Sequence, residues 1–213
     1  MIRSTWAPPP LPDDEAPEDT AGTLGGTRLY EQPAHAAQRD AALAFAARPG
    51  PLVIEVGFDH GMRLLDAARA HPDVRFLGLE LRKARVEAVA PHAPPNAFVW
   101  RADARAVLGA VWPAGTAARV EVFFPTPTED PRRLLFRPGF VRALARVLQP
   151  DGVLHLRTDV GPYAAWVGTR LPGWSAVAPP PALTGTLSRR ERVCRRDGLP
   201  VFEGAWSPPK IVI

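Results

Sequence analysis

Apolar and polar positions follow a block pattern from about Gln38 onward. Short apolar runs rich in Val, Leu, Ile and Phe alternate with segments whose apolar residues recur at helical spacing, and Pro or Gly separates many of them. The expected strands are 52–57, 74–81, 97–103, 118–124 and 152–159, and the expected helices are 39–47, 62–71, 82–90, 104–111, 139–148 and 162–171. Strands that alternate with helices predict an α/β fold, a doubly wound parallel sheet with helices on both faces.

The first part of the chain has a different composition. Residues 1–25 are rich in Pro, Asp, Glu and Gly, which predicts a flexible tail, whereas 26–213 predict one domain. The first twenty residues have no apolar core of the kind that a signal peptide needs, and no apolar run approaches 18 residues. We therefore expect a cytoplasmic protein with no membrane-spanning segment.

Acidic residues and glycines gather where the first three expected strands end. Glu55 lies inside the first strand, Gly57 and Gly61 flank the turn after it, Glu80 ends the second strand, and Asp103 follows the third. Ligands of parallel sheets bind beyond these carboxyl ends, and an acid after the second strand can accept both ribose hydroxyls of a nucleoside. The alternative is that each acid is a solvated loop residue.

The turn after the first strand reads GFDHG, so it lacks the G-x-G-x-x-G spacing that cradles a pyrophosphate. Glu55 would also repel a pyrophosphate. S-adenosylmethionine carries a sulfonium, an ammonium and a ribose but no phosphate, and the acids favour it as the cofactor. Cys194 is the single cysteine, which excludes an internal disulfide and a cysteine-based zinc site, and no metal site is expected.

A proline-rich loop follows the fourth expected strand. The run VEVFF at 120–124 leads directly into Pro125, Pro127 and Pro131. Because proline fixes its own φ, the sequence predicts a stiff loop at the ligand-binding edge of the sheet.

Several stretches occur in an order typical of one known family: IEVGFDHG, FLGLELRKARV, RAD, FFPTP, VLQPDGVLHLRTDVGPYA and SRRERVCRRDGLPV. Across residues 50–205 the chain resembles the bacterial tRNA (guanine-N7)-methyltransferases, which modify a guanine in the tRNA variable loop. This resemblance implies the class I S-adenosylmethionine-dependent methyltransferase fold, a Rossmann-like sheet of six parallel strands and one antiparallel strand.

The resemblance also implies roles for individual residues. The implied cofactor contacts are Glu55, Gly57, Gly61, Glu80, Asp103 and Phe124. The implied substrate contacts are Thr126, Thr158, Asp159, Tyr163, Ser188, Arg189 and Glu191, of which Thr126 and Asp159 occupy the catalytic positions.

The chain departs from the family pattern in the proline-rich loop. Thr126 stands where the family has its active-site aspartate, and Thr128 replaces a tryptophan. Glu129 and Asp130 stand where positive charge is expected. Two further departures are Asp59 in place of glycine and Arg190 in place of an aromatic residue.

Three functions remain open at this point. The first is N-methylation of tRNA guanine. The second is N-methylation of a small heteroaromatic molecule, which the altered loop favours. The third is a non-catalytic partner protein with a vestigial cofactor site. Lys83 and Lys210 are the only lysines among 26 basic residues, and arginine suits phosphate contacts, but a net charge of +4 does not decide the partner. A monomer or a homodimer is expected.

Overall fold

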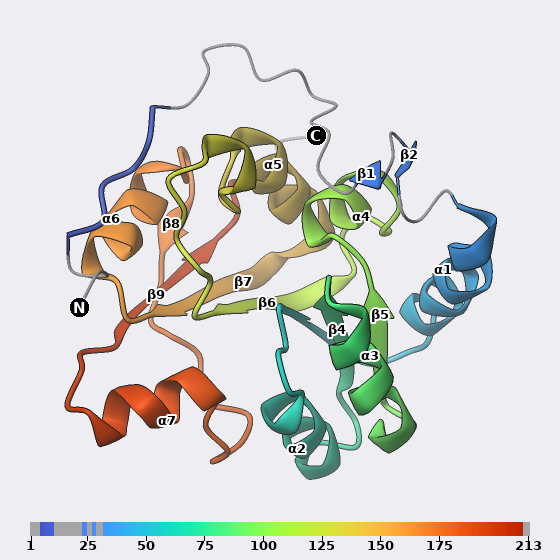
Figure 1. Cartoon of the computed structure of the whole chain (residues 1–213). Coiled ribbons are helices and arrows are strands. Elements are labelled where there is room, and N and C mark those ends of the chain that lie inside the picture. Colours follow the sequence, from blue (N-terminus) through green and yellow to red (C-terminus); the bar gives the residue numbers. More distant parts are fainter. Residues whose placement is uncertain (1–4, 11–22, 25–26, 29–31, 211–213) are drawn as a thin grey trace.

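The structure is a computed structural model, and it describes residues 5–10, 23–24, 27–28 and 32–210. Its main sheet has seven strands in the order β5-β4-β3-β6-β7-β9-β8 (Figure 1). These strands are β3 (Leu52–Val56), β4 (Arg75–Glu80), β5 (Ala97–Arg101), β6 (Ala117–Phe123), β7 (Leu148–Thr158), β8 (Ser175–Ala176) and β9 (Phe202–Ser207). Only β9 runs against the others, because it pairs antiparallel with both β7 and β8. The predicted sheet of six strands in one direction and one antiparallel strand is confirmed.

Seven helices of the described chain surround this sheet. They are α1 (Pro33–Ala46), α2 (Met62–Ala70), α3 (Lys83–Val89), α4 (Ala104–Ala110), α5 (Pro138–Val147), α6 (Gly161–Thr169) and α7 (Arg189–Arg196). None of the helices in the described residues is long and apolar enough to cross a membrane.

Two apolar cores form because successive residues of a strand point to opposite faces of the sheet. In β3, Leu52 and Ile54 belong to the core that packs against α1, α4, α5 and α6. Val53, between them, belongs to the core that packs against α2 and α3. The alternation along one buried strand therefore explains why helices cover both faces.

Most element boundaries lie within a few residues of those that the sequence predicts. The first helix is longer, since it begins at Pro33 and not at Arg39; proline is well placed in a first turn, where its missing N–H has no partner in the helix. The periodicity does not predict α7, β8 or β9. Part of the predicted N-terminal tail, residues 11–22, lies outside the described residues, whereas Trp6 packs against the larger core.

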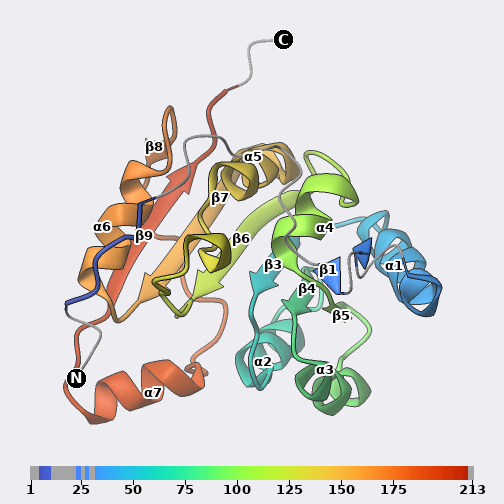
Figure 2. The same cartoon turned by 45° about the horizontal axis from the view of Figure 1, so that its top comes forward.

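The parallel strands all point toward the same side of the molecule. On that side α7 lies close to α2, so it stands beyond the carboxyl ends of the strands (Figure 2). This arrangement brings a late segment of the chain to the edge where the sequence predicts a ligand.

Candidate active site

A cavity of about 430 Å³ lies at the carboxyl ends of the central strands. Three parts of the chain line it: the turn from Glu55 to Arg63 with Glu80 and Arg82, the loop from Phe123 to Thr126 with Arg133 and Leu135, and the segment 187–190 with Arg192. The cavity therefore brings together eight of the predicted site residues, namely Glu55, Gly57, Gly61, Glu80, Phe124, Thr126, Ser188 and Arg189.

The glycine-flanked turn has a backbone that favours glycine at both ends. Gly61 has φ 71°, and a Cβ there would lie 2.6 Å from the side chain of Val89. Gly57 has φ 78°, and a Cβ there would meet no atom within 4 Å. Asp59 adopts φ 51°, which Asp tolerates better than most residues. The turn thus holds a left-handed backbone and leaves open space beside Gly57.

Glu55 is held in the wall of this cavity by an arginine. Its Oε2 lies 2.8 Å from Nη2 of Arg63, which also bonds Glu121 at 2.5 Å. The guanidinium of Arg63 lies 4.4 Å from the ring centre of Phe123. Burial raises the pKa of Glu55, even though Arg63 acts to lower it. Burial also opposes ionisation of Glu121, but Arg63 and Arg119 together lower its pKa.

The other two predicted cofactor acids lie in different surroundings. Glu80 is buried at the cavity wall, where its Oε1 accepts hydrogen bonds from the backbone N–H and the Nε of Arg82, at 3.0 and 3.3 Å. Asp103 is also buried but is not among the lining residues. It caps α4 by accepting a hydrogen bond of 2.9 Å from the backbone N–H of Arg105.

The loop after β6 is bonded to β7 where it meets the cavity. Phe124 has φ 52°, which is rare for a residue other than glycine, and its N–H donates to the carbonyl of Arg157 at 2.7 Å. Phe124, Pro125 and Thr126 all line the cavity. The predicted stiff loop therefore forms one wall of the candidate site.

Three predicted substrate residues, at and beyond the end of β7, are not among the residues that line the cavity. The Oγ1 of Thr158 accepts a hydrogen bond from the N–H of Val160 at 3.2 Å. Asp159 pairs with Arg190, whose Nε donates at 2.9 Å, and Arg190 lines the cavity. Tyr163 is buried in the larger core, and this burial raises its pKa.

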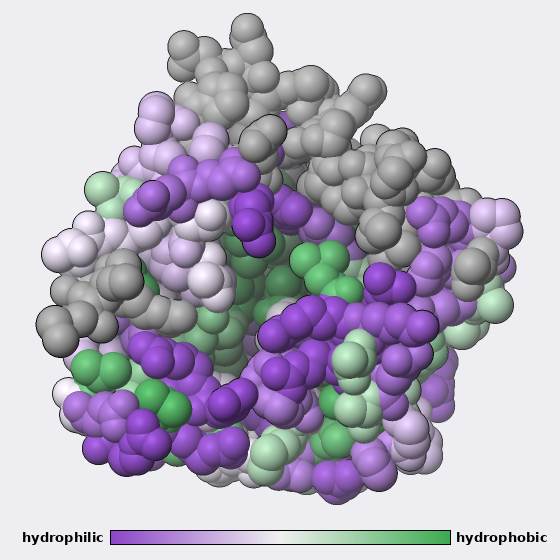
Figure 3. Space-filling view, viewed as in Figure 1, coloured by the Kyte–Doolittle hydropathy of each residue, from purple (hydrophilic) through white to green (hydrophobic). Residues whose placement is uncertain are grey.

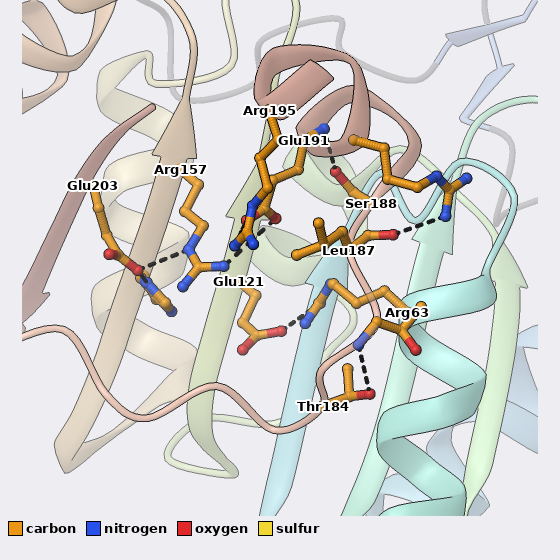
Figure 4. A network of polar contacts seen from close by, with 12 residues as sticks. Arg63, Glu121, Arg157, Thr184, Leu187, Ser188, Glu191, Arg195 and Glu203 are labelled. Carbon is orange, nitrogen blue, oxygen red and sulfur yellow. Dashed lines mark hydrogen bonds and ion pairs between the residues drawn. The ribbon is translucent and has the colours of Figure 1, made fainter. Parts of the chain in front are cut away.

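The start of α7 is anchored by a polar network (Figure 4). The Oγ of Ser188 caps the helix by accepting from the N–H of Glu191 at 3.1 Å. Glu191 itself is buried and lies 3.2 Å from Arg195 and 3.6 Å from Arg157. The Nε of Arg157 also lies 2.7 Å from Oε1 of Glu203 in β9. Glu191 thus fixes α7 to the sheet, while Ser188 and Arg189 reach the cavity.

Sequence reasoning missed the arginines that pair with the acids. Arg63 begins a helix and Arg82 follows a strand, so each reads as an ordinary surface residue. Arg190 was recognised only as a departure from the family pattern. The available signal was the acid-x-Arg spacing of Glu80–Arg82 and Asp103–Arg105, which lets each arginine fold back on its acid.

The strand order, the antiparallel β9 and a cavity beyond the carboxyl ends define a class I methyltransferase fold. The structure of the 16S rRNA (adenine(1408)-N(1))-methyltransferase from Catenulisporales acidiphilia has the same fold, with a TM-score of 0.57 and 16% identity over 81% of this chain and 94% of that chain. Residues 49–178 match the model of a family described as "Putative methyltransferase".

Curated relatives identify the family more closely. A tRNA (guanine-N(7)-)-methyltransferase of Leifsonia xyli subsp. xyli is 41% identical over 57% of this chain and 56% of the relative. One from Saccharophagus degradans is 32% identical over 72% of this chain and 69% of the relative. The chain belongs to the family of these tRNA (guanine-N7)-methyltransferases. It spans about three fifths of the length of the first curated relatives, between 56% and 62%.

Proposed function

We propose that this protein binds S-adenosylmethionine and transfers its methyl group to a ring nitrogen of guanine in tRNA. The observation that carries the proposal is the composition of one cavity. The turn at Gly57 and the acid Glu80 share it with the loop at Phe124–Thr126 and with Ser188. A cofactor side and a substrate side thus meet at the same edge of the sheet. Membership of the family supports this function.

The cavity residues fit the cofactor. The open space beside Gly57 lets a ligand approach the backbone. The Oε2 of Glu80 accepts only a long bond of 3.4 Å from Arg82, so it has capacity for a ribose hydroxyl. The carboxylate of Glu55 is negative charge in the cavity wall, and an ammonium group of the cofactor would share it with Arg63, whose Nη2 lies 2.8 Å from Oε2. When bound, S-adenosylmethionine supplies a methyl group on a positively charged sulfur.

The main task of the residues on the substrate side is to position the guanine base of the substrate. A guanine ring nitrogen with a free lone pair needs no strong base, and positioning alone contributes roughly 7–11 kcal/mol to such reactions. Phe124 and Pro125 provide a fixed wall, and Thr126 offers one hydroxyl to a base edge. Asp159 acts on this side through Arg190, which it holds at the cavity.

A second candidate function is N-methylation of a small heteroaromatic molecule. Thr126 cannot give the paired charge that a carboxylate offers to a guanine edge, and a site that hydrogen-bonds its substrate discriminates through such groups. Thr126→Asp separates the two functions: it should raise methylation of tRNA guanine, or lower activity on a small molecule whose site has adapted to threonine.

The deciding experiment supplies methyl-labelled S-adenosylmethionine together with total tRNA or with a small-molecule extract. Label in a guanine of tRNA supports the proposal, and label only in the extract supports the second candidate. Cofactor binding without label in either fraction would indicate a non-catalytic protein and overturn both.

A further inference from the structure

A short N-terminal segment, residues 5–10, packs against the body of the protein through Trp6. The ring of Trp6 lies 5.2 Å from that of Tyr163 at an angle of 73°, and 5.8 Å from that of Trp166 at 76°. Edge-to-face pairs of this geometry are favourable beyond the area that they bury. Both partners belong to α6, the helix that follows Thr158 and Asp159.

The same side chain reaches the proline-rich loop. The indole Nε1–H of Trp6 donates a hydrogen bond of 3.4 Å to the carbonyl oxygen of Thr128. Thr128 is two residues beyond Thr126, which lines the cavity. Trp6 therefore joins α6 to the loop that forms part of the cavity wall, although 122 residues separate Trp6 from Thr128.

The loop has few backbone donors with which to bond the rest of the protein. Pro125, Pro127 and Pro131 have no backbone N–H, so three positions of this short segment cannot donate to the rest of the protein. The carbonyl groups of the loop remain available as acceptors. The indole of tryptophan suits them because it can donate a hydrogen bond but cannot accept one. Trp6 supplies such a donor from a ring that is already fixed by packing against α6.

We propose that Trp6 is a positioning residue for the substrate, which holds residues 126–131 of the loop against α6, whereas Phe124 is held separately by its N–H bond to the carbonyl of Arg157. Trp6 is not among the lining residues and does not contact Glu55 or Glu80, so it acts on the substrate side and leaves the cofactor side unchanged. The expected effect of Trp6 on activity rests on the proposed methyl transfer. Its expected effect on the loop does not depend on any substrate.

The test compares Trp6→Ala and Trp6→Phe with Pro8→Ala, an exposed position in the same segment. Hydrogen exchange of the Asp130 amide, which donates to the Oγ1 of Thr128 at 3.1 Å, should become about tenfold faster in Trp6→Ala, because the ring contacts and the hydrogen bond that hold Thr128 are lost. Trp6→Phe retains ring packing and should show a smaller increase. Pro8→Ala should match the wild type.

Kinetics on the methylated substrate provide the second measurement. Trp6→Ala should raise KM for the substrate several-fold, while calorimetry shows affinity for S-adenosylmethionine within twofold of wild type. Unchanged loop exchange in a folded Trp6→Ala protein would overturn the anchoring role, and equal losses of cofactor and substrate affinity would overturn its restriction to the substrate side. If the wild type methylates neither tRNA nor a small molecule, the proposed function fails and loop exchange alone decides the role of Trp6.

Discussion

An arginine accompanies each acid to which the sequence gives a role. Five such pairs occur: Glu55 with Arg63, Glu80 with Arg82, Asp103 with Arg105, Asp159 with Arg190, and Glu191 with Arg195. A guanidinium stabilises the ionised form of a carboxylate that would otherwise be costly to bury. A ligand that binds one of these acids must therefore share the carboxylate with an arginine. Substitution of an acid should affect ligand affinity, and substitution of a buried arginine should affect the free energy of unfolding.

Glu80→Ala should weaken binding of S-adenosylmethionine at least tenfold. The reason is that a charged acceptor in a closed site contributes roughly 1.5–3 kcal/mol. Isothermal titration calorimetry measures the change. Glu87→Ala, an exposed acid of the neighbouring α3, serves as the control and should bind as wild type. An unchanged affinity in Glu80→Ala would remove this residue from the cofactor site.

Arg63→Met should destabilise the fold by about 3 kcal/mol, because it leaves the buried Glu55 without its cation and deprives Glu121 of one of two arginines. Urea denaturation at neutral pH measures the free energy of unfolding. Arg69→Met on the same helix removes an exposed pair with Asp66 and an exposed hydrogen bond of 3.3 Å to the carbonyl of His92, and its effect should stay below about 1 kcal/mol. Similar losses in both variants would contradict the structural role of the buried pair.

At the scale of elements, ion pairs and hydrogen bonds link β9 and α7 to β7. The side chains of β7 that make them point from one face of the sheet. His155 and Arg157 of β7 both contact Glu203 of β9, at 2.6 and 2.7 Å, and Arg157 extends to Glu191 of α7. His155 is buried, and its Nδ1 has no hydrogen-bond partner among the described residues. Because the imidazole of His155 is buried, the contact between β7 and β9 should depend on pH.

Stability should fall as the pH drops below 6.5. Burial lowers the pKa of His155 from its ordinary value of 6.5; Arg157 adds to this effect, while Glu203 and Glu121 oppose it. The unfolded chain therefore binds this proton more readily than the folded protein does. The contribution of neutral His155 is present above 6.5 and is lost below it, by at most about 1.4 kcal/mol per pH unit.

Urea denaturation between pH 7.5 and pH 5.5 checks this dependence. His155→Gln should reduce the slope of stability against pH in this window, whereas His92→Gln, an exposed control, should retain it. The assignment would be wrong if the His155 variant kept the full slope.

At the scale of the molecule, positive charge gathers around the cavity despite a small net charge. Arg133, Arg189 and Arg192 line it, in addition to the arginines that are paired with acids there. Figure 3 shows this face hollowed near its middle, with apolar residues in the hollow and hydrophilic residues around it. Glu129 and Asp130 lie in the adjoining loop and oppose a polyanion.

Binding of tRNA should therefore depend on salt, but only moderately. Three phosphate contacts would give a log–log slope of affinity against salt concentration of roughly −2 to −3, since each contributes about −0.7 to −0.9. Arg189→Gln should make the slope shallower by about one contact. Arg142→Gln, on the exposed side of α5, should not change it. Fluorescence anisotropy with labelled tRNA measures the slope for the wild type and for each variant. A wild-type slope near zero would contradict phosphate contact at the cavity.

Much of the fold could be predicted because its strands and helices carry their own periodicity. The central strand β3 and the helices α2 to α6 all appear near the expected positions. The strands β8 and β9 were missed because β8 has two exposed residues, and β9 has Gly204 and a mixed pattern of exposure. Their place depends on pairing with β7, which is set by contacts far apart in the sequence. Glu80 and Gly57 could be located at the cavity from the order of strands alone.

The sequence by itself determined the class of sheet, the edge at which a ligand binds, and the positions of most acids at that edge, because these follow from local periodicity and from the direction of parallel strands. Only the tertiary structure decided which of these residues meet. It placed Glu80 at the cavity and Asp103 on a helix cap, it paired Asp159 with Arg190, and it brought Trp6 to Thr128. The physical reason is that side-chain pairing depends on distances between segments that the chain order does not fix.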